Sequence, residues 1–197
     1  NAITVVRGAP ASLTIDEIDI NIIKKSKIFL TQLEIPIDVT LHCLKAAKQS
    51  GLVNILNPAP ACKLDKEFFS LADYFTPNEA EAEFYTGVKI SNENDAKESA
   101  KKLLKLGLKK VIITLGGKGL FYSDGKEEIY MKALPFKNIE DTTGAGDAFN
   151  GGLAYALSKD KSIKECLNIA NQVAGLSTLK LGAGNSMPTL KDINLKV

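Results

Sequence analysis

The 197-residue sequence has few of the residues on which several common kinds of site depend. It contains one histidine, His42, and three cysteines, Cys43, Cys62 and Cys166, which are far apart and without a Cys-x-x-Cys spacing. Neither a disulfide framework nor a structural zinc site is therefore expected, and a reducing, cytoplasmic setting fits best. A histidine-dependent hydrolase or metal enzyme would have to rely on His42 alone. His42 falls within an amphipathic stretch, which favours a surface or packing role.

Long apolar runs and blocks of one charge are also missing. No apolar run approaches the roughly 20 residues that a helix needs to cross a bilayer, and no basic-then-apolar leader is present. The 25 basic and 23 acidic residues are mixed along the chain and give a formal net charge of +2. We therefore expect neither a membrane nor a nucleic acid as a partner. The first residue is Asn1 rather than Met, which is consistent with the removal of residues upstream.

The remaining composition is that of an ordinary globular protein, with 45% hydrophobic and 24% charged residues. A chain of this length and composition predicts one compact unit with a full-sized core. Two widespread nucleotide motifs are absent, because no stretch matches Gly-x-x-x-x-Gly-Lys-Ser/Thr or Gly-x-Gly-x-x-Gly. The sequence therefore does not favour a P-loop enzyme or a dinucleotide-binding protein.

Short apolar stretches alternate with stretches of helical periodicity along the chain. The stretches "KIFLT", "LVNIL", "DYF" and "VIIT" predict buried strands, residues 1–13 form a β-rich run, and a hairpin-like pair surrounds Asp124 and Gly125. Helices are predicted over residues 13–26, 37–51, 78–87, 92–110, 145–157 and 162–182. Such alternation with short connections predicts an α/β fold with a mostly parallel sheet covered by helices.

Polar residues stand where several of the predicted strands end. In parallel sheets, ligands bind beyond the carboxyl ends of the strands, which meet at one edge. The residues predicted at this edge are Gln32, Glu34, Asn57, Asn78, Thr114 and Gly116. The glycine-rich stretch "TLGGKG", residues 114–119, follows one of these strands and could admit a nucleotide.

The stretch "DTTGAGDAF", residues 141–149, has two glycines directly before an acid at the start of an apolar helical segment. One interpretation is a turn followed by an acidic first-turn residue. The other is chemistry, in which the N–H groups of Gly144, Ala145 and Gly146 and the helix dipole hold a phosphate whose charge grows in a transition state. Asp147 would then take a proton from an attacking hydroxyl.

Two further pairs of residues also have two interpretations each. Asn78 and Glu81 form an Asn-x-x-Glu pattern that predicts a helix cap, and Glu81 could equally order the hydration shell of a Mg²⁺-phosphate. Gly151 and Gly152 inside the helix cost about 1 kcal/mol each relative to alanine. Their presence indicates a close neighbour, which could be another helix or a ligand.

Taken together, these stretches resemble the ribokinase-like (PfkB-type) carbohydrate kinases. "DTTGAGDAFNGGLAYAL" is similar to the long C-terminal signature of that family, and "QLE", "NPAPA", "TPNEAEAEFYTG" and "ITLGGKG" look like further family stretches in the family's order. The similarity runs through essentially the whole chain. It implies the family's fold, a three-layer, Rossmann-like, mostly parallel sheet flanked by helices, here without the N-terminal strands and the β-lid.

The resemblance also implies the residues of an active site. Asp147 would be the catalytic base and would bind substrate together with Glu34, beside an anion hole formed by Gly144, Ala145 and Gly146. The ATP site would be lined by Asn78, Thr114, Leu115, Gly116, Gly117, Lys118, Gly119, Gly146 and Asn171.

Two kinds of metal ion are implied as well. Glu81 would act on Mg²⁺ through water. An activating monovalent cation, usually K⁺, would be held by Asp141, Thr143, Ser177, Lys180, Gly182 and Ser186, several of them through backbone carbonyls. Lys180 would have to use its main-chain oxygen, since an ammonium group cannot coordinate a cation.

The implied function is the ATP-dependent phosphorylation of a sugar hydroxyl, with D-ribose converted to D-ribose 5-phosphate. Two alternatives stay open: another acceptor (deoxyribose, a nucleoside or a fructose phosphate), or a non-catalytic, truncated nucleotide-binding fragment. A phosphorylated acceptor would require extra Arg or Lys beside the pocket, and the only arginine, Arg7, is far from the motifs. Residues 1–197 would be the C-terminal portion of a single kinase domain, whose full-length form would dimerise through the missing lid.

Overall fold

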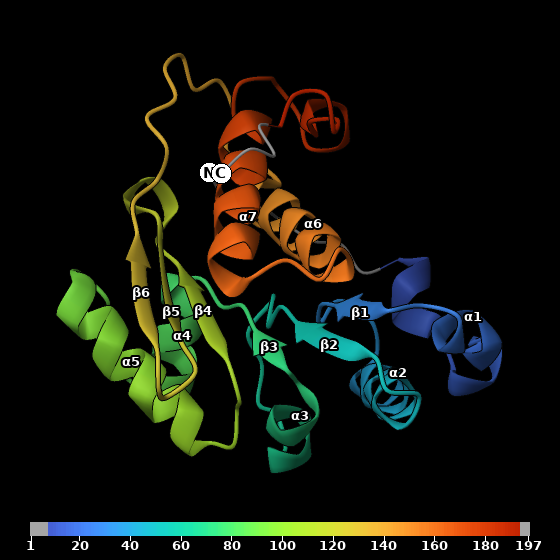
Figure 1. Ribbon diagram of the computed structural model, residues 1–197. Helices are drawn as coiled ribbons and strands as arrows, with labels where there is room; N and C mark the ends of the chain where they lie inside the picture. The colour runs from blue at the N-terminus through green and yellow to red at the C-terminus, as the bar shows by residue number, and fades with distance from the viewer. Residues whose placement is uncertain (1–7, 194–197) are drawn as a thin grey trace. The chain divides into compact units, whose positions relative to one another are not determined.

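Residues 8–193 are described by the computed structural model, which contains a six-stranded sheet in the order β1-β2-β3-β4-β5-β6 (Figure 1). The strands are β1 Ile28–Thr31, β2 Val53–Leu56, β3 Tyr74–Phe75, β4 Val111–Thr114, β5 Leu120–Ser123 and β6 Glu128–Met131. The pairs β1–β2, β2–β3 and β3–β4 are parallel. The connections that lead into β5 and β6 are too short for a parallel crossover. The sheet is therefore mixed, and the predicted mostly parallel α/β class is confirmed.

Local capping patterns set the starts of several helices. Within residues 8–193 the α-helices are α1 Ile20–Lys24, α2 Ile37–Gln49, α3 Lys66–Leu71, α4 Glu79–Thr86, α5 Glu93–Lys105, α6 Ala145–Ser158 and α7 Ile163–Ser177. Reciprocal capping boxes open α4, α5 and α7, with Asn78, Asn92 and Ser162 as the N-caps. None of these helices is long and apolar enough to cross a membrane.

The described residues divide into two compact units. One, here called the sheet unit, comprises residues 8–114 and 121–129 and contains α1–α5 and β1–β4. The other, here called the helical unit, comprises residues 115–120 and 130–193 and contains α6 and α7. The strands β5 and β6 run across the boundary between them.

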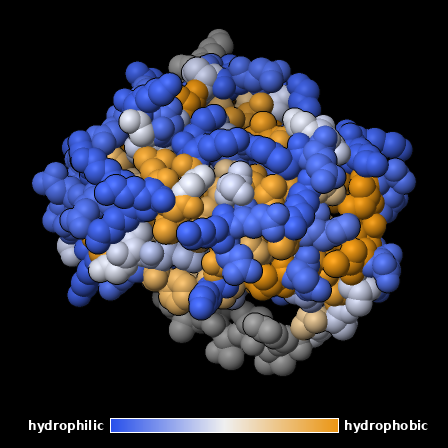
Figure 2. Space-filling view, turned by 90° about the horizontal axis from the view of Figure 1, so that it is seen from below, coloured by the Kyte–Doolittle hydropathy of each residue, from blue (hydrophilic) through white to orange (hydrophobic). Residues whose placement is uncertain are grey.

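Aliphatic and aromatic side chains form the core of the sheet unit. Leu44 of α2, Ile55 of β2, Phe75 of β3 and Ile112 of β4 are completely buried. Helix α2 packs against β1 and β2, while α4 and α5 pack against β4. Each such side chain stabilises the fold by about 1.5–3 kcal/mol relative to its exposed state. The face of the molecule in Figure 2 is mostly hydrophilic, with hydrophobic side chains in groups between the charged ones.

In the helical unit, α6 and α7 pack closely along their length. A Cβ atom on Gly152 of α6 would lie 3.0 Å from Cα of Ala170 and from Cβ of Val173, both on α7. A Cβ atom on Gly151 would meet nothing within 4 Å. The close neighbour predicted for this glycine pair is therefore another helix, and only Gly152 needs it.

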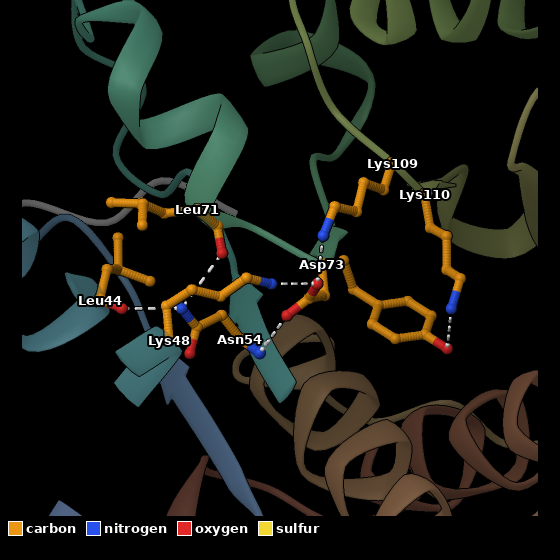
Figure 3. A network of polar contacts seen from close by, with 8 residues as sticks. Leu44, Lys48, Asn54, Leu71, Asp73, Lys109 and Lys110 are labelled. Atoms are coloured by element: carbon orange, nitrogen blue, oxygen red, sulfur yellow. Dashed lines mark hydrogen bonds and ion pairs between the residues drawn. The ribbon is translucent and has the colours of Figure 1, made fainter. Parts of the chain in front are cut away.

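A polar network centred on Asp73 joins the amino ends of the strands in the sheet unit (Figure 3). Asp73 directly precedes β3, and its Oδ2 accepts the N–H of Asn54 in β2 over 3.0 Å. Its Oδ1 lies 2.5 Å from Nζ of Lys48, at the end of α2, and 3.2 Å from Nζ of Lys109, before β4. Burial alone would raise the pKa of Asp73, but the hydrogen bonds from Lys48, Asn54 and Lys109 outweigh it and lower that pKa. One carboxylate thus ties the end of α2 and the strand β2 to the start of β3 and to the residues before β4.

The N-terminal region differs from the sequence prediction. Residues 13–26 were predicted as one helix, but the chain forms a 3₁₀ turn over Ile15–Glu17 and a separate short helix, α1. Asp19 interrupts the helical pattern, because it has an extended backbone and its side chain accepts the N–H of Asn21 to start α1. The β-rich run predicted over residues 1–13 lies mostly outside the described residues, and Ala9–Ser12 within it forms a 3₁₀ turn.

Candidate functional site

A row of hydrogen-bonded polar side chains lies at the carboxyl ends of the parallel strands. Gln32, which follows β1, donates from Nε2 to Oδ1 of Asn57 over 2.9 Å. Asn57, which follows β2, donates from Nδ2 to the carbonyl of Thr76 over 2.8 Å. Asn57 and Thr76 are buried. The strands β1, β2 and β3 are in register where they end, so these residues share one edge as predicted.

Asn78 and Thr114 continue this edge. They form a parallel bridge, and the N–H of Thr114 donates to the carbonyl of Pro77 over 2.9 Å. Asn78 caps α4 by accepting the N–H of Glu81 at Oδ1 over 2.8 Å. In return, the N–H and Nδ2 of Asn78 each donate to one carboxylate oxygen of Glu81 over 2.9 Å. The capping interpretation is therefore confirmed.

The Glu81 carboxylate is an unusual capping group because it is only 8% exposed. Burial raises the pKa of this carboxyl, and the hydrogen bond from the N–H of Asn78 offsets part of that effect. Both oxygens are engaged by Asn78, but an ionised carboxylate has about four lone-pair sites, so Glu81 keeps acceptor capacity for a water molecule. The residue is therefore suited to holding a metal-bound water.

Glu34 lies in the turn after β1 and is exposed. The preceding residue, Leu33, is buried and its N–H donates to the carbonyl of Ala59 over 2.9 Å. Together with the bond between Gln32 and Asn57, this contact joins the "QLE" stretch to the "NPAPA" stretch. Two of the motifs found separately in the sequence are thus neighbours in the sheet unit.

In the helical unit, α6 begins at Ala145 with Gly144 as its N-cap. Gly144 has a left-handed backbone (φ 77°), and a Cβ atom there would lie 3.1 Å from Cβ of Ala183 and 3.3 Å from Cε of Met187. No side chain caps the start of α6, and the N–H of Ala145 donates to the carbonyl of Thr142 over 3.2 Å. Asp147 lies in the first turn and is exposed. The helix start therefore combines a place for an anion with a nearby carboxylate.

Asp141 fixes the loop before α6 to the segment after α7. Its Oδ1 accepts the N–H of Thr143, and its Oδ2 accepts the N–H of Gly182, each over 2.9 Å. The N–H of Thr143, its hydroxyl and the N–H of Gly182 hold the pKa of Asp141 below its ordinary value. Thr178 was not among the predicted site residues, yet its carbonyl accepts the N–H groups of Glu140 (2.9 Å) and Asp141 (3.3 Å).

The other residues predicted to hold a cation belong to the same region of the helical unit. Ser177 and Ser186 are buried, and their hydroxyls donate to the carbonyls of Ala174 (2.8 Å) and Ala183 (2.7 Å). Lys180 is exposed. Carboxylate, hydroxyl and carbonyl oxygens are hard ligands that suit an alkali or alkaline-earth cation. Residues 8–193 contain no group of three or more His, Cys, Asp and Glu residues that could form a different metal site.

Residues 115–119 of the glycine-rich stretch and Asn171 also lie in the helical unit. Gly116–Lys118 form an exposed 3₁₀ turn closed by a hydrogen bond from the N–H of Leu115 to the carbonyl of Gly119 (2.8 Å). Gly119 has φ 109°, and a Cβ atom there would lie 2.6 Å from the N atom of Ala133, so only glycine fits. Asn171 is buried and donates from Nδ2 to the carbonyl of Lys132 over 2.8 Å. Its Oδ1 remains available as an acceptor.

The predicted site residues therefore form two groups, one in each unit. The sheet unit contains Glu34, Asn78, Glu81 and Thr114, which lie after β1, β3 and β4. The helical unit contains the residues of the glycine-rich stretch, the α6 start, the cation loop and Asn171: Leu115, Gly116, Gly117, Lys118, Gly119, Asp141, Thr143, Gly144, Ala145, Gly146, Asp147, Asn171, Ser177, Lys180, Gly182 and Ser186.

Comparison with known proteins identifies the class to which this arrangement belongs. The sequence matches the pfkB family of carbohydrate kinases over residues 6–190. It is 41% identical to a ribokinase of Haemophilus influenzae over 170 residues, or 86% of this chain and 55% of the relative. It is 31% identical to a deoxyribokinase of Salmonella typhi over 98% of this chain and 64% of the relative. The chain therefore belongs to the pfkB carbohydrate kinase family.

The fold is also similar to that of a solved family structure. The structure of Arabidopsis thaliana ribokinase complexed with ribose and ATP matches the whole of this chain with a TM-score of 0.90 and 32% sequence identity. The match covers 65% of the Arabidopsis chain. This chain thus spans between about half and two thirds of the length of these three relatives.

Proposed function

We propose that this chain carries the ATP-binding side and the catalytic base of an ATP-dependent sugar kinase that converts D-ribose to D-ribose 5-phosphate. The observation that carries the proposal is the start of α6, where Gly144 provides no capping side chain and the exposed carboxylate of Asp147 lies in the first turn. The dipole and backbone N–H groups at a helix N-terminus favour binding of a transferring phosphoryl group, and a carboxylate one turn away can accept a proton.

In the proposed reaction, a hydroxyl oxygen of the sugar attacks the γ-phosphorus of ATP in line with the leaving oxygen of ADP. The hydroxyl proton passes to the carboxylate of Asp147. The N–H groups of Gly144, Ala145 and Gly146 stabilise the charge on the transferred group. Such a reaction depends on positioning and charge stabilisation more than on covalent chemistry, which fits a site built from backbone groups and one acid.

The residues proposed to bind the nucleotide are Asn78, Thr114, Leu115, Gly116, Gly117, Lys118, Gly119, Gly146 and Asn171. Binding of ATP is supported by the similarity to a structure described as a complex with ribose and ATP. Glu81 would hold Mg²⁺ through water, and the oxygen-rich loops around Asp141 and Gly182 would hold the activating monovalent cation.

The acceptor we favour is D-ribose, with Glu34 and Asp147 as its contacts in this chain. The bonds that join the "QLE" and "NPAPA" stretches support this choice, because they support the position of the turn that carries Glu34. Deoxyribose is the second candidate, since a deoxyribokinase is among the relatives. Arg7, the only arginine and thus the one guanidinium that could bind a phosphorylated acceptor, lies outside the described residues.

The proposal is tested by Asp147→Asn in an assay of sugar-dependent ADP release. We expect kcat to fall on the order of 10²- to 10⁴-fold, the usual contribution of a general base, with the ATP dissociation constant little changed. The matched control is Asp160→Asn, which neutralises an exposed aspartate just beyond the other end of α6. D-ribose and deoxyribose are compared as acceptors in the same assay.

Each outcome has a definite meaning for the proposal. Near-normal turnover by the Asp147→Asn variant would exclude Asp147 as the base. ATP binding without ADP release, with either sugar, would favour the non-catalytic nucleotide-binding alternative. Higher kcat/KM for deoxyribose than for ribose would keep the kinase assignment and change the acceptor.

A further inference from the structure

The segment between β6 and α6, residues 132–141, has no helix or strand of its own. It leads directly into the loop that precedes Gly144. Three positions of α7 and its C-cap contact this segment: Asn171, Gly175 and Thr178. Their spacing of four and three residues places them on one face of the helix. The contacted positions of the segment, Lys132, Phe136 and Glu140, are also four residues apart.

The first and third contacts are hydrogen bonds. Asn171 donates from Nδ2 to the carbonyl of Lys132 over 2.8 Å. At the other end, the carbonyl of Thr178 accepts the N–H groups of Glu140 and Asp141. Each bond fixes one end of the segment to α7. No such hydrogen bond to α7 is made by the seven residues between the two ends, so the position of the middle of the segment depends on side-chain packing.

The middle contact is between the ring of Phe136 and the bare backbone of Gly175. A Cβ atom on Gly175 would lie 2.5 Å from Cδ2 of Phe136 and closer still to Cε2. A contact under 3.0 Å cannot be accommodated without movement, so the ring occupies the space that any other residue at position 175 would fill. The backbone at Phe136 forms a tight turn, in which its N–H donates to the carbonyl of Leu134 over 2.8 Å.

Only a few residues separate this contact from the start of α6 along the chain. Asp141 ends the segment, and its carboxylate holds the N–H groups of Thr143 and Gly182. Gly144 follows, against Ala183 and Met187. We infer that Phe136, seated on Gly175, is a positioning residue: it sets the path of residues 132–141 and thereby the placement of the Gly144–Asp147 turn. This inference rests on the proposed function only for its effect on turnover.

The positioning role predicts reciprocal effects of two substitutions. Gly175→Ala adds the Cβ atom that displaces the ring, and Phe136→Val removes all three ring atoms, Cδ2, Cε2 and Cζ, that this Cβ would meet. We expect each single variant to raise amide hydrogen exchange in residues 138–146 by about tenfold, since local opening becomes easier. In the double variant the alanine fills part of the space that valine leaves, and exchange should return toward the wild-type rate.

Hydrogen exchange measured by mass spectrometry on the full chain, without ATP or sugar, tests this directly. Ile139→Ala is the matched control, because Ile139 lies in the same segment and is 58% exposed. Exchange in residues 138–146 that stays at the wild-type rate in both single variants would overturn the inference. Effects that simply add in the double variant would overturn it as well, since additivity means that the two residues do not act through one contact.

Turnover provides the second measurement. A displacement of about 1 Å can cost as much as 100-fold in rate, so we expect kcat of both single variants to fall between about tenfold and 100-fold. The KM values for ATP and sugar should change much less, because Phe136 is assigned no substrate contact. Loosened exchange with unchanged kcat would overturn the positioning role. A wild-type chain without sugar-dependent ADP release would instead refute the proposed function, and the exchange data would still decide the contact.

Discussion

Replacing Asp73 by asparagine tests whether one carboxylate holds the amino ends of the sheet-unit strands together. The substitution keeps the size of the side chain and one oxygen that can accept the N–H of Asn54. It removes the negative charge that Lys48 and Lys109 share. It also places an amide where two ammonium groups now meet one oxygen (Figure 3).

The expected loss follows from the exposure of the two ion pairs. The Lys109 side chain is 55% exposed, so its pair contributes at most about 1 kcal/mol. Asp73 is 17% and Lys48 32% exposed, and a hydrogen bond to a charged group at such a site contributes about 1.5 kcal/mol. We therefore expect the free energy of unfolding to fall by about 2 kcal/mol. For a chain of this size that corresponds to about 4–8 °C in Tm.

The loss should also depend on pH in a defined direction. The folded-state pKa of Asp73 is lowered, so its stabilisation is present above the unfolded value of about 3.9 and is lost as pH falls through the folded pKa. The difference in Tm between wild type and Asp73→Asn should be constant between about pH 6 and 7. It should narrow once the pH drops below about 4.

Thermal melts followed by far-UV circular dichroism measure this difference, and Asp124→Asn is the control. Asp124 is a half-buried residue whose pKa is lowered mainly by the N–H groups of Glu127 and Lys126, which an asparagine oxygen still accepts. The control should lose less than about 0.5 kcal/mol. If Asp73→Asn loses no more than the control, or if its loss grows toward acid pH, the assigned role of the carboxylate is wrong.

Two other predictions concern the helices of the site. Gly151→Ala should stabilise the chain by about 0.5–1 kcal/mol and Gly152→Ala should destabilise it by about 1–3 kcal/mol, because only the second substitution adds a Cβ against α7. Urea unfolding measures both changes. Free energies of unfolding that change in the same direction in both variants would contradict this packing. Burial raises the folded pKa of Glu81, so its stabilising effect is full below the unfolded pKa and is lost as pH rises. The Tm of Glu81→Gln should therefore rise relative to that of wild type as the pH increases from about 4 to 7, and a Tm difference that stays constant over this range would contradict the effect of burial.

Local signals in the sequence were sufficient for most of the elements. Asn78 and Ser162 were predicted to start helices from their spacing to a glutamate, and each makes the reciprocal hydrogen bonds of a capping box. Gln32 and Asn57 were predicted at one sheet edge from the ends of two strands, and they are hydrogen-bonded to each other. These features depend on residues only a few positions apart or on the geometry of parallel strands.

Contacts between distant residues had no such signal. Nothing near Asp73 indicates that Lys48 and Lys109, 25 and 36 residues away, converge on it. The carbonyl of Thr178 receives two N–H groups because of where a helix ends, and backbone groups carry no residue-specific pattern. A close packing contact at Gly175 could have been inferred from the sequence, since a glycine inside a helix costs about 1 kcal/mol and usually has a packing reason. Its partner, Phe136, could be found only from the structure.

The three contacts between α7 and residues 132–141 constrain the length of that segment. Exposed loops ordinarily tolerate insertions and deletions, because nothing ties their interior to the fold. Here three contacts tie the loop to α7 at fixed intervals. They join Asn171 to Lys132, Gly175 to Phe136 and Thr178 to Glu140. One added or deleted residue between positions 133 and 139 would leave at least one contact without its counterpart. Although irregular, this connection has a length as fixed as that of a strand in a sheet.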